Sequence, residues 1–253
     1  LVELRNVGKS YGNITALKDI SLRVHAGQVT GILGDNGAGK STLIKIIAGL
    51  HQQTEGELLV DGEATKFSSP ADALGKGIAT VYQNLAVVPL MPVWRNFFLG
   101  QEIRKKSFPW SLDANAMRAT TLAELSKMGI ELPDVDAPIG SLSGGQRQCV
   151  AIARAVFFGA RVLILDEPTA ALGVKQSGVV LKYITAAKEA GFGVVFITHN
   201  PHHAHMVGDH FVLLNRGRQK LDCTYDEISL EHLTQQMAGG DELQALSHEL
   251  GRK

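Results

Sequence analysis

The chain has few cysteines, no excess of either charge and no long apolar run. Its two cysteines, Cys149 and Cys223, cannot build a disulfide framework and lack the spacing of a zinc site. We therefore expect both to be buried thiols in a reducing compartment. The 25 basic and 25 acidic side chains cancel, so no global field draws the protein to nucleic acid or to an anionic membrane.

No uninterrupted apolar run approaches the ~20 residues that a membrane-spanning helix needs, and the start shows no signal-peptide pattern. With 253 residues, of which 45% are apolar, the chain can bury a sizeable core in one large domain or two small ones. We expect a protein of the cytoplasm. The lack of a membrane-spanning run and of a signal peptide does not exclude binding to a membrane protein.

A glycine-rich segment fits the phosphate-binding pattern G-x-x-x-x-G-K-[ST] without a gap. A strand is predicted before it, over 28–33, and a helix after it, over 41–50. Glycines let backbone N–H groups approach phosphate oxygens, and a helix start adds unpaired donors. Lys40 supplies a positive charge for the β- and γ-phosphates, and Ser41 offers a hydroxyl to Mg²⁺. The expected nucleotide-binding residues of this segment are Gly34, Asn36, Gly37, Gly39, Lys40, Ser41 and Thr42.

Two carboxylates follow the continuous apolar run over 162–165, which is typical of a buried parallel strand. Asp166 is expected to hold Mg²⁺ together with Ser41. Glu167 is expected to polarise the water that attacks the γ-phosphate. By themselves these could be surface acids at a strand end, but the phosphate-binding segment upstream favours the catalytic interpretation.

The segment Leu142-Ser143-Gly144-Gly145-Gln146 predicts a second anion cradle, because it joins a capping serine, two glycines and a helix start. One nucleotide cannot easily use both cradles of a compact subunit, since a helical insertion displaces the second. We therefore expect a head-to-tail pair of subunits, in which Ser143, Gly145 and Gln146 of one copy complete the site of the other. The alternative is an ordinary Ser-Gly-Gly turn.

Alternating strands and helices predict an α/β fold: a P-loop NTPase core with a mostly parallel sheet, an N-terminal antiparallel β subdomain and an inserted α-helical subdomain. One domain is expected, with its core over 1–85 and 159–238, the helical subdomain over about 86–158, and a tail over 239–253 that is loose or forms a short helix. Strands are predicted over 2–7, 20–24, 57–65, 78–82, 162–165, 194–198 and 211–214. Further helices are predicted from 70 to about 75 or 77, and over 113–128, 143–158, 175–190 and 227–237.

Within the insertion, Asp113 is predicted to cap a helix that presents Met117, Leu122 and Leu125 on its apolar face. The basic run Arg104-Lys105-Lys106 is typical of a solvated surface, and the sequence assigns it no function.

These motifs resemble those of the ATP-binding subunits of ABC transporters, and the resemblance covers about Val2 to Leu221. It rests on Gly34–Thr42 as the Walker A segment, Leu142–Gln146 as the family signature and Leu163–Glu167 as the Walker B segment. The implied cofactors are ATP and Mg²⁺.

The resemblance also implies roles for three residues that carry little signal alone. Gln83 matches the Q-loop, which contacts Mg²⁺ and the attacking water and responds to the transmembrane partner. His199 matches the switch histidine, which hydrogen-bonds the γ-phosphate, and Tyr11 matches the aromatic residue that stacks on adenine. Gly173 departs from the pattern, because the family usually has Asp there, and this puts strict communication between two sites in doubt.

Within the family, Val81–Asn84, Val88-Pro89 and Asn96–Gly100 are similar to bacterial importers of ribose, xylose and fructose. Such ATPases are often tandem duplications on one chain, whereas this chain has one copy, so a head-to-tail homodimer is expected. The similarity implies that it is bound peripherally to an integral-membrane permease on the cytoplasmic side of the bacterial inner membrane. A periplasmic sugar-binding protein would be an indirect partner, and no nucleic acid is expected to bind.

Four other interpretations are weaker. An ABC-type ATPase of DNA repair would need a long coiled coil, and one of translation two ATPase units on one chain. A nucleoside kinase or GTPase does not need the segment around Ser143, and a purely structural nucleotide-binding module does not need Glu167 or His199. A different transported substrate also stays open.

The histidines after Pro201 are expected to begin a helix rather than to bind a metal.

Overall fold

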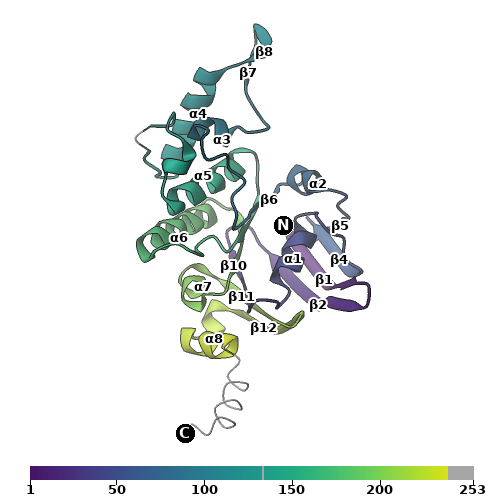
Figure 1. The fold of residues 1–253 in the computed structure, drawn as a ribbon. Coiled ribbons are helices and arrows are strands. Elements are labelled where there is room, and N and C mark those ends of the chain that lie inside the picture. The colour runs from purple at the N-terminus through teal and green to yellow at the C-terminus, as the bar shows by residue number, and fades with distance from the viewer. Residues whose placement is uncertain (133, 239–253) are drawn as a thin grey trace.

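Two β-sheets organise the computed structural model, which describes residues 1–132 and 134–238 (Figure 1). The smaller sheet is antiparallel, and its strand order is β2 (Ile14–Val24), β1 (Val2–Tyr11), β4 (Glu55–Val60) and β5 (Glu63–Ala64). The larger sheet has the order β12 (Arg218–Thr224), β11 (His210–Asn215), β3 (Val29–Leu33), β10 (Gly193–Thr198), β9 (Val162–Asp166) and β6 (Ile78–Val81). Its strands pair in parallel except β12, which runs antiparallel to β11.

Each face of the larger sheet belongs to a different apolar cluster. Along β10, Val194 and Phe196 lie in one cluster, while Val195 and Ile197 lie in the other. This alternation follows from the two-residue period of a strand. The second cluster also contains α1 (Lys40–Ile47) and the inner face of the smaller sheet, so α1 is held between the two sheets. The core therefore fixes the start of α1 against the larger sheet.

The remaining helices pack mainly on the first cluster. Between β6 and β9 the chain forms α3 (Val93–Phe97), the hairpin of β7 (Arg104–Lys105) and β8 (Phe108–Leu112), α4 (Ala114–Lys127), the 3-10 turn η1 (Ile139–Ser141) and α5 (Gly144–Phe157). Elsewhere lie α2 (Pro70–Gly75), α6 (Val174–Glu189), α7 (Pro201–Val207), the 3-10 turn η2 (Tyr225–Glu227) and α8 (Leu230–Met237). Figure 1 shows α3, α4 and α5 gathered at one end of the molecule, and α7 and α8 toward the other.

The predicted α/β fold class is confirmed, including the antiparallel N-terminal sheet, the parallel sheet and the helical insertion. The hairpin at Asp61-Gly62, the helix capped by Ser69 and the helix capped by Asp113 are also present. The strand β12 and the hairpin of β7 and β8 were not predicted. The tail over 239–253 lies outside the described residues.

Three details of the prediction are wrong. The last helix begins at Leu230 rather than near 227, because the Ser229 hydroxyl accepts the N–H of His232 and caps the helix there. Leu122 is 44% exposed, because the buried stripe of α4 runs through Met117, Thr121 and Leu125 at intervals of four residues. Of the two cysteines, Cys149 is buried, and burial raises the pKa of its thiol, whereas Cys223 is only half-buried.

Candidate functional site

Strand register brings the predicted catalytic segments to one edge of the larger sheet. At this edge, the residues that pair across neighbouring parallel strands are Leu33 with Thr198, Ile197 with Asp166, and Leu165 with Val81. The predicted residues that follow within two positions of these pairs are Gly34, Gln83, Glu167 and His199. Because parallel strands end at the same edge, segments far apart in the sequence meet there, as ligand sites in open α/β sheets do.

The turn between β3 and α1 requires glycine at its first position. Gly34 has φ of 145°, and an added Cβ would lie 2.4 Å from the backbone oxygen of Leu214. At the other end of the turn, Gly39 precedes α1 and no side chain caps the helix. The first N–H groups of α1 therefore lack a side-chain acceptor, which suits them to phosphate oxygens. Asn36, Gly37 and Ser41 are exposed, so this turn opens to solvent.

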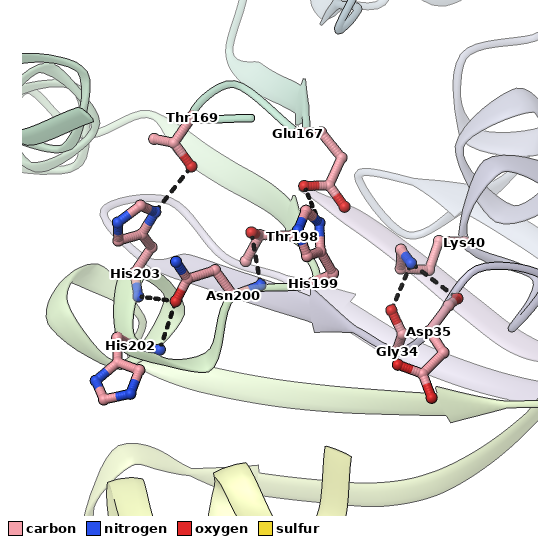
Figure 2. A network of polar contacts seen from close by, with 10 residues as sticks. All are labelled: Gly34, Asp35, Lys40, Glu167, Thr169, Thr198, His199, Asn200, His202 and His203. Carbon is pink, nitrogen blue, oxygen red and sulfur yellow. Dashed lines mark hydrogen bonds and ion pairs between the residues drawn. The ribbon is translucent and has the colours of Figure 1, made fainter. Parts of the chain in front are cut away.

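Lys40 folds back over the turn that carries it. Its ammonium donates to the backbone oxygens of Gly34 and of Asp35, the latter at 3.0 Å (Figure 2). The residue is only 8% exposed, and burial lowers the pKa of its ammonium, an effect that the carboxylates of Glu167, Asp35 and Asp166 partly offset. The positive charge is thus preorganised beside the turn, on interactions that a phosphate could replace.

Asp166 and Glu167 lie in different surroundings although they are neighbours in sequence. Burial, followed by repulsion from Glu167, raises the pKa of the Asp166 carboxyl, while Lys40 opposes this rise. Glu167 adopts a left-handed backbone with φ of 48°, and its Oε2 lies 2.9 Å from Nδ1 of His199 (Figure 2). The side chain of His199 is 60% exposed and that of Glu167 is 13% exposed. Glu167 is therefore oriented by a partner that solvent, or a ligand, can reach.

The oxygen donors at this edge suit Mg²⁺. The exposed Ser41 hydroxyl and the half-buried Asp166 carboxylate are the hard ligands that this ion takes, usually together with waters and phosphate oxygens. The raised pKa of Asp166 indicates a desolvated negative charge that lacks a sufficient counter-charge. Within residues 1–132 and 134–238, no group of three or more His, Cys, Asp and Glu is arranged to hold a metal by itself.

A contact that the sequence did not reveal ties the loop after Glu167 to α7. His203 Nδ1 lies 3.0 Å from the hydroxyl of Thr169, which is only 6% exposed (Figure 2). The Asn200 side chain accepts the N–H groups of His202 and His203 and so caps α7. The sequence signal for this cap is Asn200 followed by proline at the first helical position. Nothing local in the sequence indicates the partner of His203.

The second predicted cradle is a capped helix start. The Ser143 hydroxyl accepts the N–H of Gln146, and the Gln146 side chain accepts the N–H of Ser143. Gly145 is buried, because the backbone of Gln176 in α6 lies 3.1 Å from where its Cβ would be. Ser143 and Gly144 remain half-buried. The accessible part of the cradle is thus its serine end.

The structure does not bring this cradle to the phosphate-binding turn of the same chain. The helix α5 packs on α3, α4 and α6, whereas α1 packs against β2, and Figure 1 shows α1 and α5 apart. Four of the predicted residues lie at one edge of the larger sheet: Lys40, Asp166, Glu167 and His199. Ser143 lies in the helical insertion instead.

Gln83 and Tyr11 lie at the periphery. Gln83 is exposed just beyond the end of β6. Tyr11 is 42% exposed, its ring centroid lies 5.7 Å from that of His51, and the Lys9 ammonium lies 5.1 Å from it. Both side chains are accessible to a ligand.

An apolar groove of about 280 Å³ opens beside Gln83, between α2, β6 and α5. Its lining residues include Tyr82, Leu85, Val87, Gln101, Val150 and Arg154. Arg154 donates to the backbone oxygen of Leu99, and burial lowers the pKa of its guanidinium. No helix of the described residues is both long and apolar enough to cross a membrane.

Comparisons with known proteins agree over nearly the whole chain. A family model described as ABC transporter matches residues 17–170. The xylose/arabinose import ATP-binding protein XylG of Sulfolobus acidocaldarius is 42% identical over 94% of this chain and 93% of its own length. The fructose import ATP-binding protein FrcA of Rhizobium meliloti is 43% identical over 87% and 86% of the two chains.

Among solved structures, the dimeric ATP-binding cassette MJ0796, in a post-hydrolysis state bound to ADP and Pi, has a TM-score of 0.73 and 29% identity. The similarity covers 89% of this chain and 99% of that one. It therefore extends over most of the chain.

Proposed function

Because the chain belongs to the ABC transporter family, we propose that it hydrolyses ATP to power the import of a monosaccharide through a membrane permease. The observation that carries the ATPase assignment is the meeting of Lys40, Asp166, Glu167 and His199 at one sheet edge. The names of the two relatives, which import xylose or arabinose and fructose, support the sugar class.

In the proposed mechanism, the turn from Gly34 to Thr42 wraps the phosphates with backbone N–H groups, and the Lys40 ammonium exchanges its two backbone acceptors for β- and γ-phosphate oxygens. Tyr11 stacks on the adenine. Ser41, Asp166 and Gln83 would hold Mg²⁺, which neutralises charge on the phosphate oxygens.

The water-directing group in this proposal is Glu167. Its carboxylate accepts the hydrogen bond of the attacking water, and its contact with His199 holds it at the correct angle. His199 would act here as an imidazolium, in which Nδ1–H donates to Glu167 and Nε2–H donates to the γ-phosphate. Gln83 would contact the attacking water from the end of β6. The left-handed backbone at Glu167 supports this assignment, because strained positions cluster at functional sites.

We propose that two copies associate head to tail, so that Ser143, Gly145 and Gln146 of one copy face the γ-phosphate held by the other. The separation of the two cradles within one chain and the half-buried, still accessible serine end of α5 support this arrangement. The dimeric state of the similar cassette also supports it. The core over 1–85 and 159–238 would supply Lys40, and the helical subdomain over about 86–158 would supply Ser143.

The permease is proposed to dock in the apolar groove beside Gln83, which would couple nucleotide state to transport. The chain then acts at the cytoplasmic face of the bacterial inner membrane without spanning it. A periplasmic sugar-binding protein would deliver the sugar to the permease, so this chain needs no sugar pocket of its own.

A combined assay tests this function. The purified chain is expected to hydrolyse ATP in the presence of Mg²⁺, and Lys40→Ala is expected to weaken nucleotide binding at least about tenfold, by the loss of a charge-assisted contact. Cells that lack the gene should lose uptake of one labelled monosaccharide among xylose, arabinose, ribose and fructose. Normal uptake of all four, with a different solute lost, would assign another transported substrate.

A further inference from the structure

The basic run Arg104–Lys106 belongs to a hairpin that projects from the helical lobe. The strands β7 and β8 pair antiparallel, with Lys105 opposite Phe108. Figure 1 shows this hairpin at the end of the molecule opposite α8. The proposed ATPase mechanism gives it no role.

The hairpin is anchored at its base. The side chains of Ile103 and Leu112 are partly buried against the core of the helical lobe. The N–H of Asp113 donates to the backbone oxygen of Ile103 at 2.8 Å and closes the base. The tip is thus held in a fixed direction away from the body of the protein.

The tip exposes two large aromatic side chains. Phe108 is 56% exposed and Trp110 is 76% exposed, and their ring centroids lie 5.6 Å apart in an edge-to-face pair. Residues two apart on a strand share one face, so both rings lie on the same face of β8. The other tryptophan of the chain, Trp94, is 5% exposed and donates to Asp136. An exposed aromatic pair on a projecting tip indicates contact with something apolar.

The charged side chains near the aromatic pair at the tip of the hairpin are all basic. Lys105 and Lys106 are exposed, and Arg104 precedes them. Glu102 lies at the base, where its carboxylate accepts the N–H of Gly100. Aromatic rings beside lysines match the headgroup layer of an anionic bilayer, which attracts basic residues and accepts amphipathic rings. A convex tip with lysines suits a lipid surface better than a protein pocket.

We propose that the tip of the β7–β8 hairpin inserts Phe108 and Trp110 into the headgroup layer of an anionic membrane, with Lys105 and Lys106 on the lipid phosphates. The proposal rests on the proposed function in one respect. Gln101 lines the groove assigned to the permease, and the hairpin begins three residues later, so the base of the hairpin lies next to the surface proposed to face the membrane protein.

Tryptophan fluorescence of the full chain with protein-free vesicles tests this proposal, because Trp110 is the exposed one of two tryptophans. Phosphatidylglycerol vesicles at low salt are expected to shift the emission to shorter wavelength, and brominated acyl chains are expected to quench it. Phosphatidylcholine vesicles should need at least about tenfold more lipid for the same effect, since they lack the electrostatic attraction. Trp110→Phe, which leaves only Trp94, should show neither effect.

The double variant Lys105→Gln/Lys106→Gln should raise the half-saturating concentration of phosphatidylglycerol about 25-fold, at about fivefold for each lysine. The matched control, Lys66→Gln/Lys182→Gln, removes two exposed lysines elsewhere and should leave it unchanged. ATP hydrolysis measured on the same samples separates the two proposals, because none of these residues lies in the ATPase site. A chain that hydrolyses ATP but shows no quenching by brominated phosphatidylglycerol would overturn the hairpin proposal. If a Trp110→Ser strain then lost sugar uptake, the hairpin would be assigned to a protein contact instead.

Discussion

At the scale of single residues, two adjacent carboxylates divide the chemistry between them. Burial raises the pKa of the Asp166 carboxyl, which is placed for a cation. Glu167 instead has a hydrogen-bonding partner, His199, that keeps its oxygen directed across the sheet edge. The backbone reversal at Glu167 turns the two side chains into different surroundings. A single carboxylate could not bind the metal and direct the water at once.

Glu167→Gln tests this division. The amide keeps the size of the side chain and a hydrogen bond to His199, but it cannot accept a proton. ATP hydrolysis should fall at least about 100-fold, while ATP affinity changes little and ATP now holds the subunits together as a dimer. Steady-state hydrolysis and size-exclusion chromatography with ATP measure both effects. Glu189→Gln, on an exposed position of α6, is the matched control, and a normal rate in the Glu167 variant removes our role for that carboxylate.

At the scale of elements, α7 supports the loop that carries Glu167 through the hydrogen bond of His203 to Thr169. We expect His203→Ala to lower kcat for ATP hydrolysis several-fold and to leave KM for ATP nearly unchanged, because the loop and not the phosphate turn loses its support. The loss of a partner for a buried hydroxyl should also cost about 1 to 2 kcal/mol of unfolding free energy. His203→Gln, which can still bond Thr169, should recover most of both losses.

The same contact predicts a pH dependence. Burial, then the neighbouring His202 and His199, lowers the pKa of His203 in the folded protein. The unfolded chain therefore binds a proton at this residue first, so stability falls as the pH drops from about 6.5 through the lowered pKa. Thermal unfolding between pH 8 and pH 5 should show a smaller acid loss for His203→Gln than for the natural chain. Equal losses in the two proteins would show that His203 does not titrate as the structure requires.

The start of α6 offers a second test at this scale. Gly173 is its N-cap residue, without a side-chain hydrogen bond, no acidic residue lies in the first turn, and an added Cβ would meet open space. Gly173→Asp should therefore raise the free energy of unfolding by about 0.5 kcal/mol through capping and the helix dipole. It should also alter the cooperativity of ATP hydrolysis more than ATP affinity. Unchanged cooperativity in a correctly folded, stabilised variant would remove a role for this position in communication between sites.

At the scale of the whole molecule, the sequence predicted those parts that depend on local patterns. The glycine-rich turn, the apolar strand before Asp166 and the capping serine at position 143 each carry their own signal, and all three have the predicted structure. Long-range contacts were missed, as with His203 and Thr169, because no local pattern encodes a partner 34 residues away. Leu122 was wrongly assigned to the buried face because α4 is only weakly amphipathic, so its sequence does not determine which side of the helix faces the core. The hairpin at Arg104 was missed because β7 has only two residues and β8 contains a proline.

At the level of the dimer, we propose that ATP binds between two copies, in contact with Lys40 of one copy and with the helix start at Ser143 of the other. Two variants in the Glu167→Gln background separate these roles. Lys40→Ala removes the first contact, and Ser143→Asp keeps the helix cap but adds a negative charge that repels phosphate. Ser143→Asn, a neutral cap of the same shape, is the control and should still form the dimer.

The most direct measurement is analytical ultracentrifugation of these two variants with ATP and Mg²⁺, first alone and then mixed. Each alone should remain a monomer at an ATP concentration that saturates the natural chain, because Lys40→Ala binds ATP too weakly and Ser143→Asp cannot close over it. The mixture should form a dimer with one bound ATP, built from the intact Lys40 of one copy and the intact Ser143 of the other. A mixture that stays monomeric, although the control dimerises, would contradict the shared site.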